Sequence, residues 1–373
     1  MEIIEVNTEN RREARQFIQF PHKLYANCAQ WVPRLRRDAL GMLNRKKHPF
    51  FERSDASFFM AKAEGGEVVG RIAIIENKPF NVRSNKKRAF FYLFDVVNDQ
   101  MVAKALFDQV QVWAKARNLT EIYGPKGFAA LNGMGMLTRG FDHRPAYGIP
   151  YNYAYYPELI EHLGFRKDRE LLSGYLHRDK EIPEKVTIIA EKVRKRWGVR
   201  VDQYKNKNDL RRMLPQIKDL YNGSLVGTSG NPPLTDADVE AMANQILWFA
   251  DPTIIKVLMK KEKAAGFLLA YPDISKALQR TNGRMFPLGW LQMLIELKRT
   301  EWININGAGI IEEYRGLGGT AVLFNEMAKS VKSGRYTHAD LVQIGAENEK
   351  MLRELSSIGI EFYKSHSMYV KQI

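Results

Sequence analysis

The stretch from Trp302 to Thr320 reads WININGAGIIEEYRGLGGT, and it decides the fold. Ile303 and Ile305 alternate with polar residues, which predicts a strand with one polar face. A turn with three glycines ends the stretch, and residues 321–331 continue with the apolar spacing of an amphipathic helix. The order is therefore strand, glycine-rich turn, helix.

This order of elements predicts an anion site. The first amides of a helix have no partner within the helix, and the helix dipole adds positive charge there. Glycines allow a phosphate to approach the backbone closely, and Thr320 adds a hydroxyl. We expect a pyrophosphate ligand; the alternative is a plain glycine-rich turn. The turn is not a P-loop, because no Gly-Lys-Ser/Thr follows it. It is also a poor match to the dinucleotide-binding fingerprint, because Arg315 stands where that motif has its first glycine.

The chain also carries an approximate internal duplication. Residues 58–74 and 255–270 both have the pattern of a β-hairpin, with Gly70 and Gly266 at matching places, offset by 196 positions. Each half continues with a strand and an amphipathic helix. We expect an α+β fold (an α/β mixed sheet) in two tandem domains, residues 1–178 and 179–373.

Two motifs of the second half resemble the GNAT superfamily of acyl-CoA N-acyltransferases. Its acyl-CoA loop reads Arg/Gln-x-x-Gly-x-Gly/Ala; Arg315 and Gly318 match, whereas Thr320 departs from the pattern. The family also has an Asn followed eleven residues later by Gly-Phe, and here Asn348 precedes Gly359 at that spacing. The resemblance covers residues 200–373.

The first half resembles the same fold without its cofactor loop. Residues 95–101 stand at the equivalent place and contain no glycine. We therefore interpret residues 1–178 as a degenerate GNAT-like domain that shapes the substrate cleft or serves as a scaffold. The whole chain resembles uncharacterised bacterial proteins with two GNAT-like domains.

The resemblance implies a set of cofactor-binding residues for acetyl-CoA or another acyl-CoA. The strand backbone would pair with the pantetheine arm, the loop amides would hold the pyrophosphate, and an Asn would lie near the thioester. In the order strand, loop and Asn, the matching residues are Ala308, Gly309, Ile310, Arg315, Gly316, Leu317, Gly318, Gly319, Thr320 and Asn348.

The catalytic residues of the family do not transfer to this sequence. The position of its usual Tyr is Leu355, and a strand position that often holds a Glu base is Asn304. The candidates that remain are Asn304, Glu301, Tyr363 and His338, or an ordered water. The alternative for each side chain is a solvated or packed residue without a catalytic role. Positioning alone supplies much of the rate of such reactions.

A tyrosine-rich segment, residues 147–157, is a candidate for substrate binding. Together with residues 124–128 it could line a cleft between the halves through Tyr151, Tyr153 and Tyr155. The alternative is a packing surface between the domains.

Composition limits the cellular compartment and the kinds of ligand that we expect for the protein. The one cysteine, Cys28, excludes an internal disulfide and Cys-based metal sites, and we expect no metal. No apolar run approaches the ~20 residues that span a bilayer, and residues 1–6 favour a strand over a signal peptide, so we expect a cytoplasmic protein. The net charge of +15 fits an anionic small molecule, a nucleic acid or a membrane surface, or a solvated surface without a partner.

The predicted function is acyl-CoA-dependent acyl transfer, with acetyl the first choice, to a small-molecule or peptide amine. One alternative is an aminoacyl-tRNA-dependent transferase of the peptidoglycan-bridge type, for which the basic charge would serve tRNA. Another is a non-catalytic protein that binds acyl-CoA or a metabolite. We expect no other nucleic-acid partner, and the sequence leaves the acceptor and the oligomeric state open.

Overall fold

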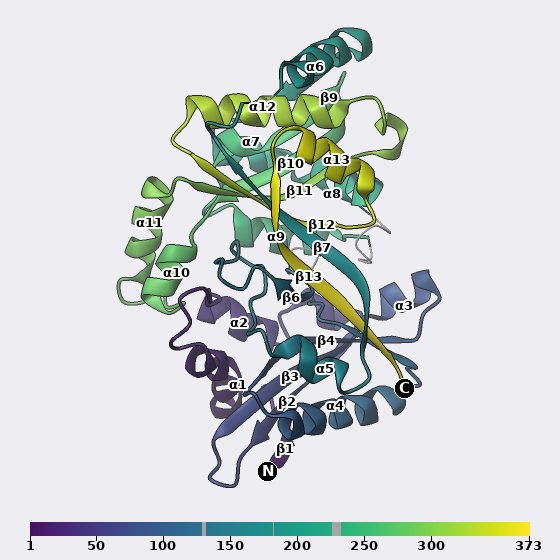
Figure 1. Cartoon of the computed structure of the whole chain (residues 1–373), viewed down its shortest axis with the longest axis vertical. Helices are drawn as coiled ribbons and strands as arrows, with labels where there is room; N and C mark the ends of the chain where they lie inside the picture. Colours follow the sequence, from purple (N-terminus) through teal and green to yellow (C-terminus); the bar gives the residue numbers. More distant parts are fainter. Residues whose placement is uncertain (129–131, 182, 226–232) are drawn as a thin grey trace. The chain divides into compact units, whose positions relative to one another are not determined.

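The computed structural model describes residues 1–128, 132–181, 183–225 and 233–373, and these form two compact units (Figure 1). Unit 1 comprises Met1–Leu172, Ser275–Met293 and Lys364–Ile373; unit 2 comprises Ser173–Ile274 and Leu294–Tyr363. The chain therefore leaves unit 1 near the expected boundary but returns to it twice. The division at residue 178 assigned both returning segments to the second half.

The described strands of unit 1 form a mixed sheet. Its strands run in the order β1 (Glu2–Glu5), β2 (Asp55–Lys62), β3 (Val68–Glu76), β4 (Arg88–Val96), β5 (Glu121–Gly124) and β13 (Glu361–Gln372), and β6 (Met136–Arg139) pairs with β13. In the described residues of this unit, β4 pairs with β5 in parallel, and the strands β1–β4, β5, β6 and β13 otherwise pair antiparallel. β13 reaches β5 through residues Tyr369–Gln372, so the C-terminal segment completes this sheet.

Both faces of the unit 1 sheet are covered, because its strands are apolar on both sides. In β2, Phe59 packs into one core and Phe58 into the other. The helices on the Phe59 side are α4 (Gln100–Lys115) and α5 (Tyr156–Glu161), and those on the Phe58 side are α1 (Arg11–Leu24) and α2 (Arg36–Met42). The unit also includes η1 (Pro49–Glu52), α3 (Lys78–Ser84), α10 (Ser275–Thr281) and the start of α11 (Gly289–Arg299).

Unit 2 repeats this plan. Its strands run in the order β8 (Val199–Asp202), β9 (Lys256–Lys260), β10 (Lys263–Pro272), β11 (Trp302–Ile310) and β12 (His338–Gly345), and the parallel pair is β11 with β12. The strand β7 (Arg166–His177) carries the chain from unit 1 into unit 2.

Helices cover both faces of this sheet as well. One face packs on α6 (Glu184–Trp197), α12 (Gly319–Ser333) and α13 (Glu349–Ser357), and the other packs on α8 (Leu214–Leu225), which contacts α7 (Lys207–Arg212) and α9 (Asp236–Ile246). Short 3₁₀ helices, η2 (Pro252–Ile254) and η3 (Glu312–Tyr314), precede β9 and α12. The prediction of tandem α+β units is confirmed. The first helix of unit 2, α6, ends at Gly198, whose backbone is in the left-handed region.

No helix in the described ranges has both the length and the hydropathy to cross a bilayer. In the same residues, no group of three or more His, Cys, Asp and Glu side chains is arranged to hold a metal ion.

Candidate functional site

The glycine-rich turn of unit 2 has the backbone geometry that its sequence requires. Gly316 and Gly318 have φ angles of +76° and +84°, and α12 begins at Gly319. A side chain at Gly318 would also collide, since its β-carbon would lie 2.6 Å from Cγ2 of Val193 on α6. Glycine is therefore needed at Gly318 both for backbone conformation and for space.

No described residue accepts a hydrogen bond from the backbone amides of residues 316–321 in this turn. Gly318 is the N-cap of α12 and makes no side-chain capping bond. The first helical amide with a recorded partner is that of Val322, which donates to the Gly318 carbonyl at 3.4 Å, and no recorded bond in the described residues uses the amides of residues 316–321. This is the condition that an anion site at a helix start requires.

Arg315 holds the turn in place. Its Nε donates to the Ile310 carbonyl at 3.1 Å, and its Nη2 donates to the Ser224 carbonyl at 2.8 Å, so the guanidinium connects the turn to the end of β11 and to α8. A different cation lies beside the turn: the Lys260 Nζ is 5.2 Å from the centre of the Tyr314 ring. Lys260 adds positive charge near the amides.

β11 and β12 separate just before the turn. Their parallel pairing runs from Trp302 opposite His338 to Ile305 opposite Leu341, and in the described strands it goes no further. On its other edge β11 stays paired with β10, where Ala308 faces Leu268 and Ile310 faces Gly266. Residues 306–310 thus have one edge that β12 does not occupy, and an extended ligand could hydrogen-bond there as an added strand.

Asn348 lies beyond β12, at the same carboxyl edge of the parallel pair as the turn. Its side-chain oxygen caps α13 by accepting from the Met351 amide at 3.2 Å. The oxygen therefore has a structural role, and a contact of Asn348 with pantetheine stays a prediction.

A buried polar cluster lies where β11 and β12 part. Asn304 is directly opposite Asp340 on β12, and its amide nitrogen is 3.3 Å from Oδ1 of Asp273. The two carboxylates are 2% and 4% exposed, and Asn304 is 1% exposed. Asn306, next on this face, donates to the Tyr271 hydroxyl. Sequence reasoning missed Asp273, Asp340 and Tyr271; the available signal was a charged residue, Asp340, inside the apolar run of residues 339–342.

The predicted catalytic candidates lie at different places. Glu301 precedes β11, and its carbonyl accepts from the amides of Thr337 and His338 at the start of β12. At ~3.3 Å per residue, the four steps from Trp302 to Asn306 put this end about 13 Å from the start of the unpaired edge. Tyr363 is on β13, with its ring 6.3 Å from that of Tyr175. Of the candidates, the structure brings only Asn304 to the separation of the strands, and all of them stay predictions.

Unit 1 has the same parallel pair but a different helix start. β4 pairs with β5 only as far as Phe90 opposite Tyr123. The helix that follows, α4, begins after Asp99, whose Oδ1 accepts from the amides of Met101 at 2.8 Å and Val102 at 3.3 Å. The carboxylate of Asp99 already occupies the anion position of this helix, which fits the expected loss of the cofactor loop.

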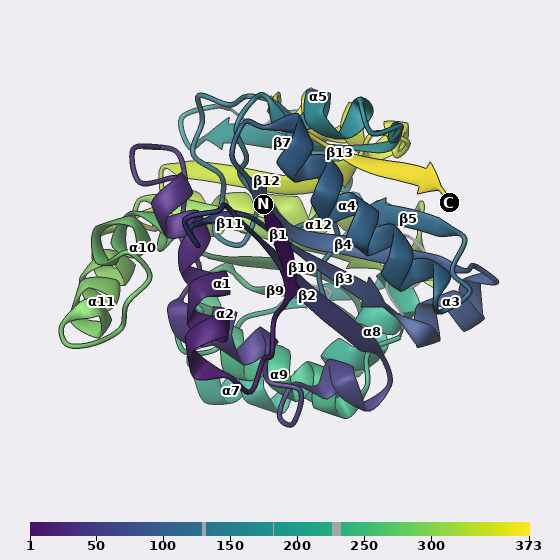
Figure 2. The same ribbon diagram turned by 90° about the horizontal axis from the view of Figure 1, so that it is seen from below.

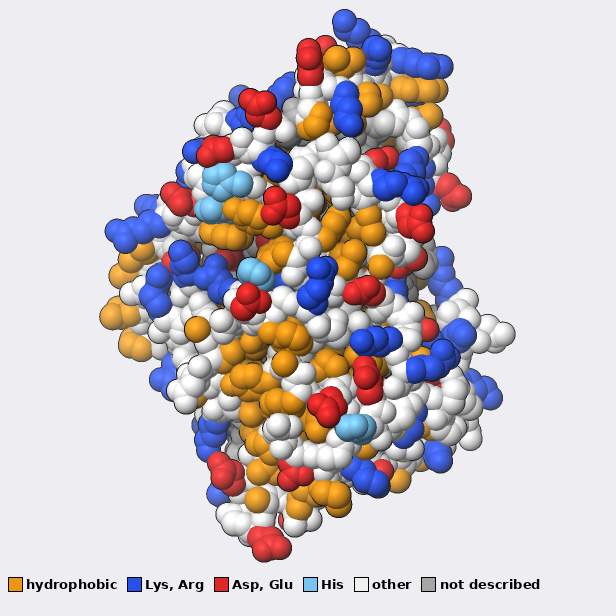
Figure 3. Space-filling view, in the orientation of Figure 1, with side chains coloured by type: hydrophobic (Ala, Val, Ile, Leu, Met, Phe, Trp, Pro, Cys, Tyr) orange, Lys and Arg blue, Asp and Glu red, His pale blue; other side chains and the backbone are white. Residues whose placement is uncertain are grey.

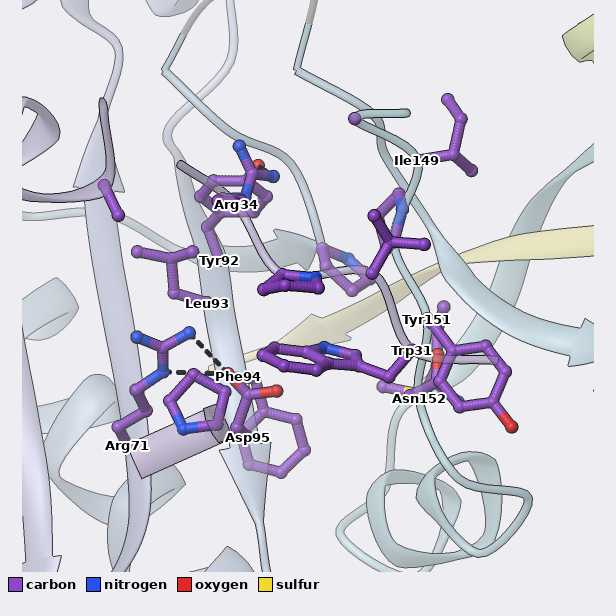
Figure 4. A pocket seen from close by; sticks show the side chains of 18 of the residues that line it. Trp31, Arg34, Arg71, Tyr92, Leu93, Phe94, Asp95, Ile149, Tyr151 and Asn152 are labelled. Atoms are coloured by element: carbon purple, nitrogen blue, oxygen red, sulfur yellow. Dashed lines mark hydrogen bonds and ion pairs between the residues drawn. The ribbon is translucent and has the colours of Figure 1, made fainter. Parts of the chain in front are cut away.

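A cavity of about 120 Å³ lies beside β4 in unit 1 (Figure 4). Its walls come from the β4 residues 92–95, from α1, from the segment before α2 and from residues 147–152. In Figure 4 the Trp31 indole lies between the Arg71–Asp95 pair and the ring of Tyr151. The walls are mainly aromatic and apolar, which is typical of a ligand pocket.

The wall of this cavity carries an ion pair and a further arginine. Arg71 is buried and pairs with Asp95 at 2.7 Å, and its Nη1 also donates to the Phe17 carbonyl at 2.8 Å. Arg34 donates to the Tyr92 hydroxyl, a neutral acceptor. Burial lowers the pKa of His22 to about 4, which keeps this imidazole neutral at pH 7.

The three tyrosines predicted to bind substrate are divided by the structure. Tyr151 lines the unit 1 cavity, and its hydroxyl donates to the Phe141 carbonyl at 3.0 Å. Tyr153 and Tyr155 pack against the α4 core and donate to the carbonyls of Leu24 and Val96. Their roles in substrate binding stay predictions.

In each unit the two parallel strands separate, and a helix connects the first strand to the second; this is the fold of the tandem GNAT proteins. A tandem GNAT protein from the clavulanic acid biosynthesis pathway superposes with a TM-score of 0.58, at 10% identity, covering 100% of this chain and 98% of that one. A GCN5-related N-acetyltransferase from Sphaerobacter thermophilus gives 0.51 at 12% identity, covering 99% and 95%.

Two curated proteins are similar in sequence over nearly their whole length. The chain is 26% identical over 371 residues to Protein YghO of Escherichia coli (strain K12), covering 98% of this chain and 94% of that protein. It is 24% identical over 374 residues to the bacterial ceramide synthase of Caulobacter vibrioides (strain NA1000 / CB15N), covering 97% and 95%. No family model matches the sequence.

Proposed function

We propose that this protein is an acyl-CoA-dependent N-acyltransferase that uses the site in unit 2. The observation that carries the proposal is that no described residue bonds the amides of residues 316–321, which directly follow the edge of β11 that β12 leaves unpaired. A diphosphate fits the first feature and an extended pantetheine arm fits the second. Lys260 supplies nearby positive charge for the phosphates.

The reaction joins an amine to an acyl group. Bound acyl-CoA supplies a thioester carbonyl carbon; the amine nitrogen bonds to it as the C–S bond breaks, and the thiolate takes up a proton. An ammonium must first lose a proton, which requires a base near the separation of the strands. We assign this role to Asp340, held opposite Asn304, either directly or through one water. The resemblance to the family did not provide this residue.

The acceptor we propose is an amine on a long alkyl chain. The ceramide synthase relative motivates this choice, because a ceramide is the N-acyl derivative of a long-chain amino alcohol, and the similarity extends over both chains. The acyl group is either acetyl, as the family resemblance implies, or a longer chain, as this relative favours. A panel of acyl-CoAs from two to sixteen carbons, assayed with sphinganine as acceptor, distinguishes these donors.

The two alternative functions, a tRNA-dependent transferase and a non-catalytic binding protein, require different features of this site. A transferase that takes its acyl group from aminoacyl-tRNA has no need of free amides for a diphosphate at Gly318–Thr320. A protein that only senses acyl-CoA would keep the turn but has no need of a buried carboxylate where the strands part. The amides together with Asp340 therefore favour the enzyme.

A matched pair of variants tests the cofactor site. Thr320 is the second residue of α12, and Met101 is the second residue of α4, 67% exposed. A glutamate at this position suits a helix start in either unit, so both Thr320→Glu and Met101→Glu should fold. We expect acyl-CoA to raise the melting temperature of the wild type and of Met101→Glu. The melting temperature of Thr320→Glu should be the same with and without acyl-CoA. Equal shifts in all three proteins, or none, would refute the assignment.

A further inference from the structure

An apolar surface is exposed between α10 and α11. Phe286 is 81% exposed and Trp290 is 45% exposed, although large aromatic side chains are normally buried. The other large apolar side chains exposed here are Leu288, Leu291 and Leu294. We call these five residues the hairpin patch. A contiguous exposed patch of this kind marks a surface that another body covers.

The patch includes one side of an amphipathic helix. Trp290, Leu291 and Leu294 lie within about 100° of each other around α11 and are exposed, whereas Met293 and Glu296 lie on the opposite side and are buried. Figure 2 shows α10 and α11 side by side as a helical hairpin. The apolar side chains therefore face away from the core that α11 packs on.

Basic residues flank the patch. Residues 275–300 contain one acidic residue, Glu296, and it is buried. The exposed charges of this stretch are all positive: Lys276, Arg280, Arg284, Lys298 and Arg299. In Figure 3, hydrophobic side chains at the left edge of the view, over α10 and α11, lie next to Lys and Arg side chains. This charge is complementary to an anionic surface.

The hairpin is fixed to unit 1 rather than loosely attached. The Gln279 side chain donates to the carbonyls of Ala29 at 2.7 Å and Trp31 at 3.0 Å. The Gly283 carbonyl accepts from the Arg36 amide at 2.9 Å. The exposed side chains are thus presented by a supported element, as an interaction surface requires.

We propose that the hairpin patch docks on an anionic lipid bilayer. Trp, Phe and Leu on one side of a helix would insert at the boundary of headgroups and acyl chains, while Lys and Arg would contact the phosphates of the headgroups. The rival occupant, a second copy of the chain, would carry the same five exposed cations into the interface, which like-charge repulsion opposes. The inference goes beyond the proposed function, because it concerns where the protein works.

Flotation with lipid vesicles tests the proposal. We expect the wild type to bind vesicles of equal parts phosphatidylglycerol and phosphatidylcholine, and to bind pure phosphatidylcholine at least about tenfold more weakly, because four to five basic residues contribute. The double variant Phe286→Ser/Trp290→Ser should lose at least about tenfold in affinity for the mixed vesicles. Val82→Ser on α3, where the valine is 83% exposed, is the matched control and should bind like the wild type.

Three outcomes would overturn the inference. The first is that the wild type fails to float with mixed vesicles, and the second is that the double variant floats as well as the wild type. The third is a dimer in sedimentation velocity that the same two substitutions convert to a monomer, which would identify a second copy as the occupant. Acyl-CoA thermal shifts measured without lipid do not depend on the patch, so they separate a failure here from a failure of the proposed function.

Discussion

Gly318 and Asp99 stand at the same place in the two units, directly before the helix that connects the two parallel strands, and they differ in whether they bond the first amides of that helix. Asp99 bonds the first amides of α4 with its own carboxylate. Gly318 offers no side chain, and the amides after it have no recorded partner among the described residues. The same helix start is thus closed in unit 1 and open in unit 2.

Removal of the cap in unit 1 should destabilise the protein without changing its cofactor affinity. Asp99→Ala leaves the amides of Met101 and Val102 without their acceptor, which costs about 1 kcal/mol of unfolding free energy. Urea unfolding measures this loss, and isothermal titration with CoA measures the affinity. A weaker affinity for CoA would mean that Asp99 contributes to the cofactor site.

Alanine at the two left-handed glycines of the turn should have unequal effects. Both substitutions strain the backbone by about 1–2 kcal/mol. Gly318→Ala adds a clash with Val193, whereas a β-carbon at Gly316 meets open space. We expect Gly318→Ala to lower the melting temperature more than Gly316→Ala does. The double variant Gly318→Ala/Val193→Ala should recover part of this difference, because the shorter side chain removes the clash. Equal losses at the two glycines would show that the α6 contact is unimportant.

Asp340→Asn should slow catalysis far more than it weakens cofactor binding. A general base contributes about 10²- to 10⁴-fold to the rate, and Asn has nearly the same shape as Asp. We therefore expect kcat to fall at least about 100-fold with the CoA thermal shift preserved. Glu301→Gln, at the far end of β11, is the matched control and should stay within about twofold of the wild type, in line with an exposed site. A large loss in Glu301→Gln would instead support the candidate suggested by the sequence.

Stability should fall between pH 6.5 and pH 4. Burial lowers the pKa of both His22 and His366 from 6.5 to about 4 in the folded protein. Between these values the unfolded chain binds more protons than the folded one, so the free energy of unfolding decreases as the pH falls. Calorimetry at pH 7, 5.5 and 4.5 should show this decrease in the free energy of unfolding. The decrease should be smaller in the His22→Gln variant. A flat profile would mean that these rings are protonated in the folded state.

The turn could be predicted from sequence because its requirements are local. Glycines with positive φ, a strand before them and an amphipathic helix after them all lie within residues 302–331. Asp273 and Asp340 could not be predicted, because they reach Asn304 only when separate strands are paired. The paths of residues 275–293 and 364–373 back to unit 1 also depend on contacts distant in sequence.

The tyrosine-rich segment shows why residue type alone does not identify a cleft. A phenol satisfies its hydroxyl equally well on a backbone carbonyl as on a ligand. All three tyrosines donate to backbone carbonyls, but Tyr153 and Tyr155 pack against the core, whereas Tyr151 lines the cavity. Nothing in the local sequence distinguishes the three.

The pairing of β13 with β5 constrains how the protein can be made. β5 has β4 on one side and residues 369–372 on the other, and the Ile373 amide donates to the Thr120 carbonyl at 3.0 Å. A ribosome must therefore synthesise both units before the sheet of the first one closes. During translation, Ile122 and Tyr123 lie on a strand edge that is still unpaired, where a chaperone or a neighbouring nascent chain could bind.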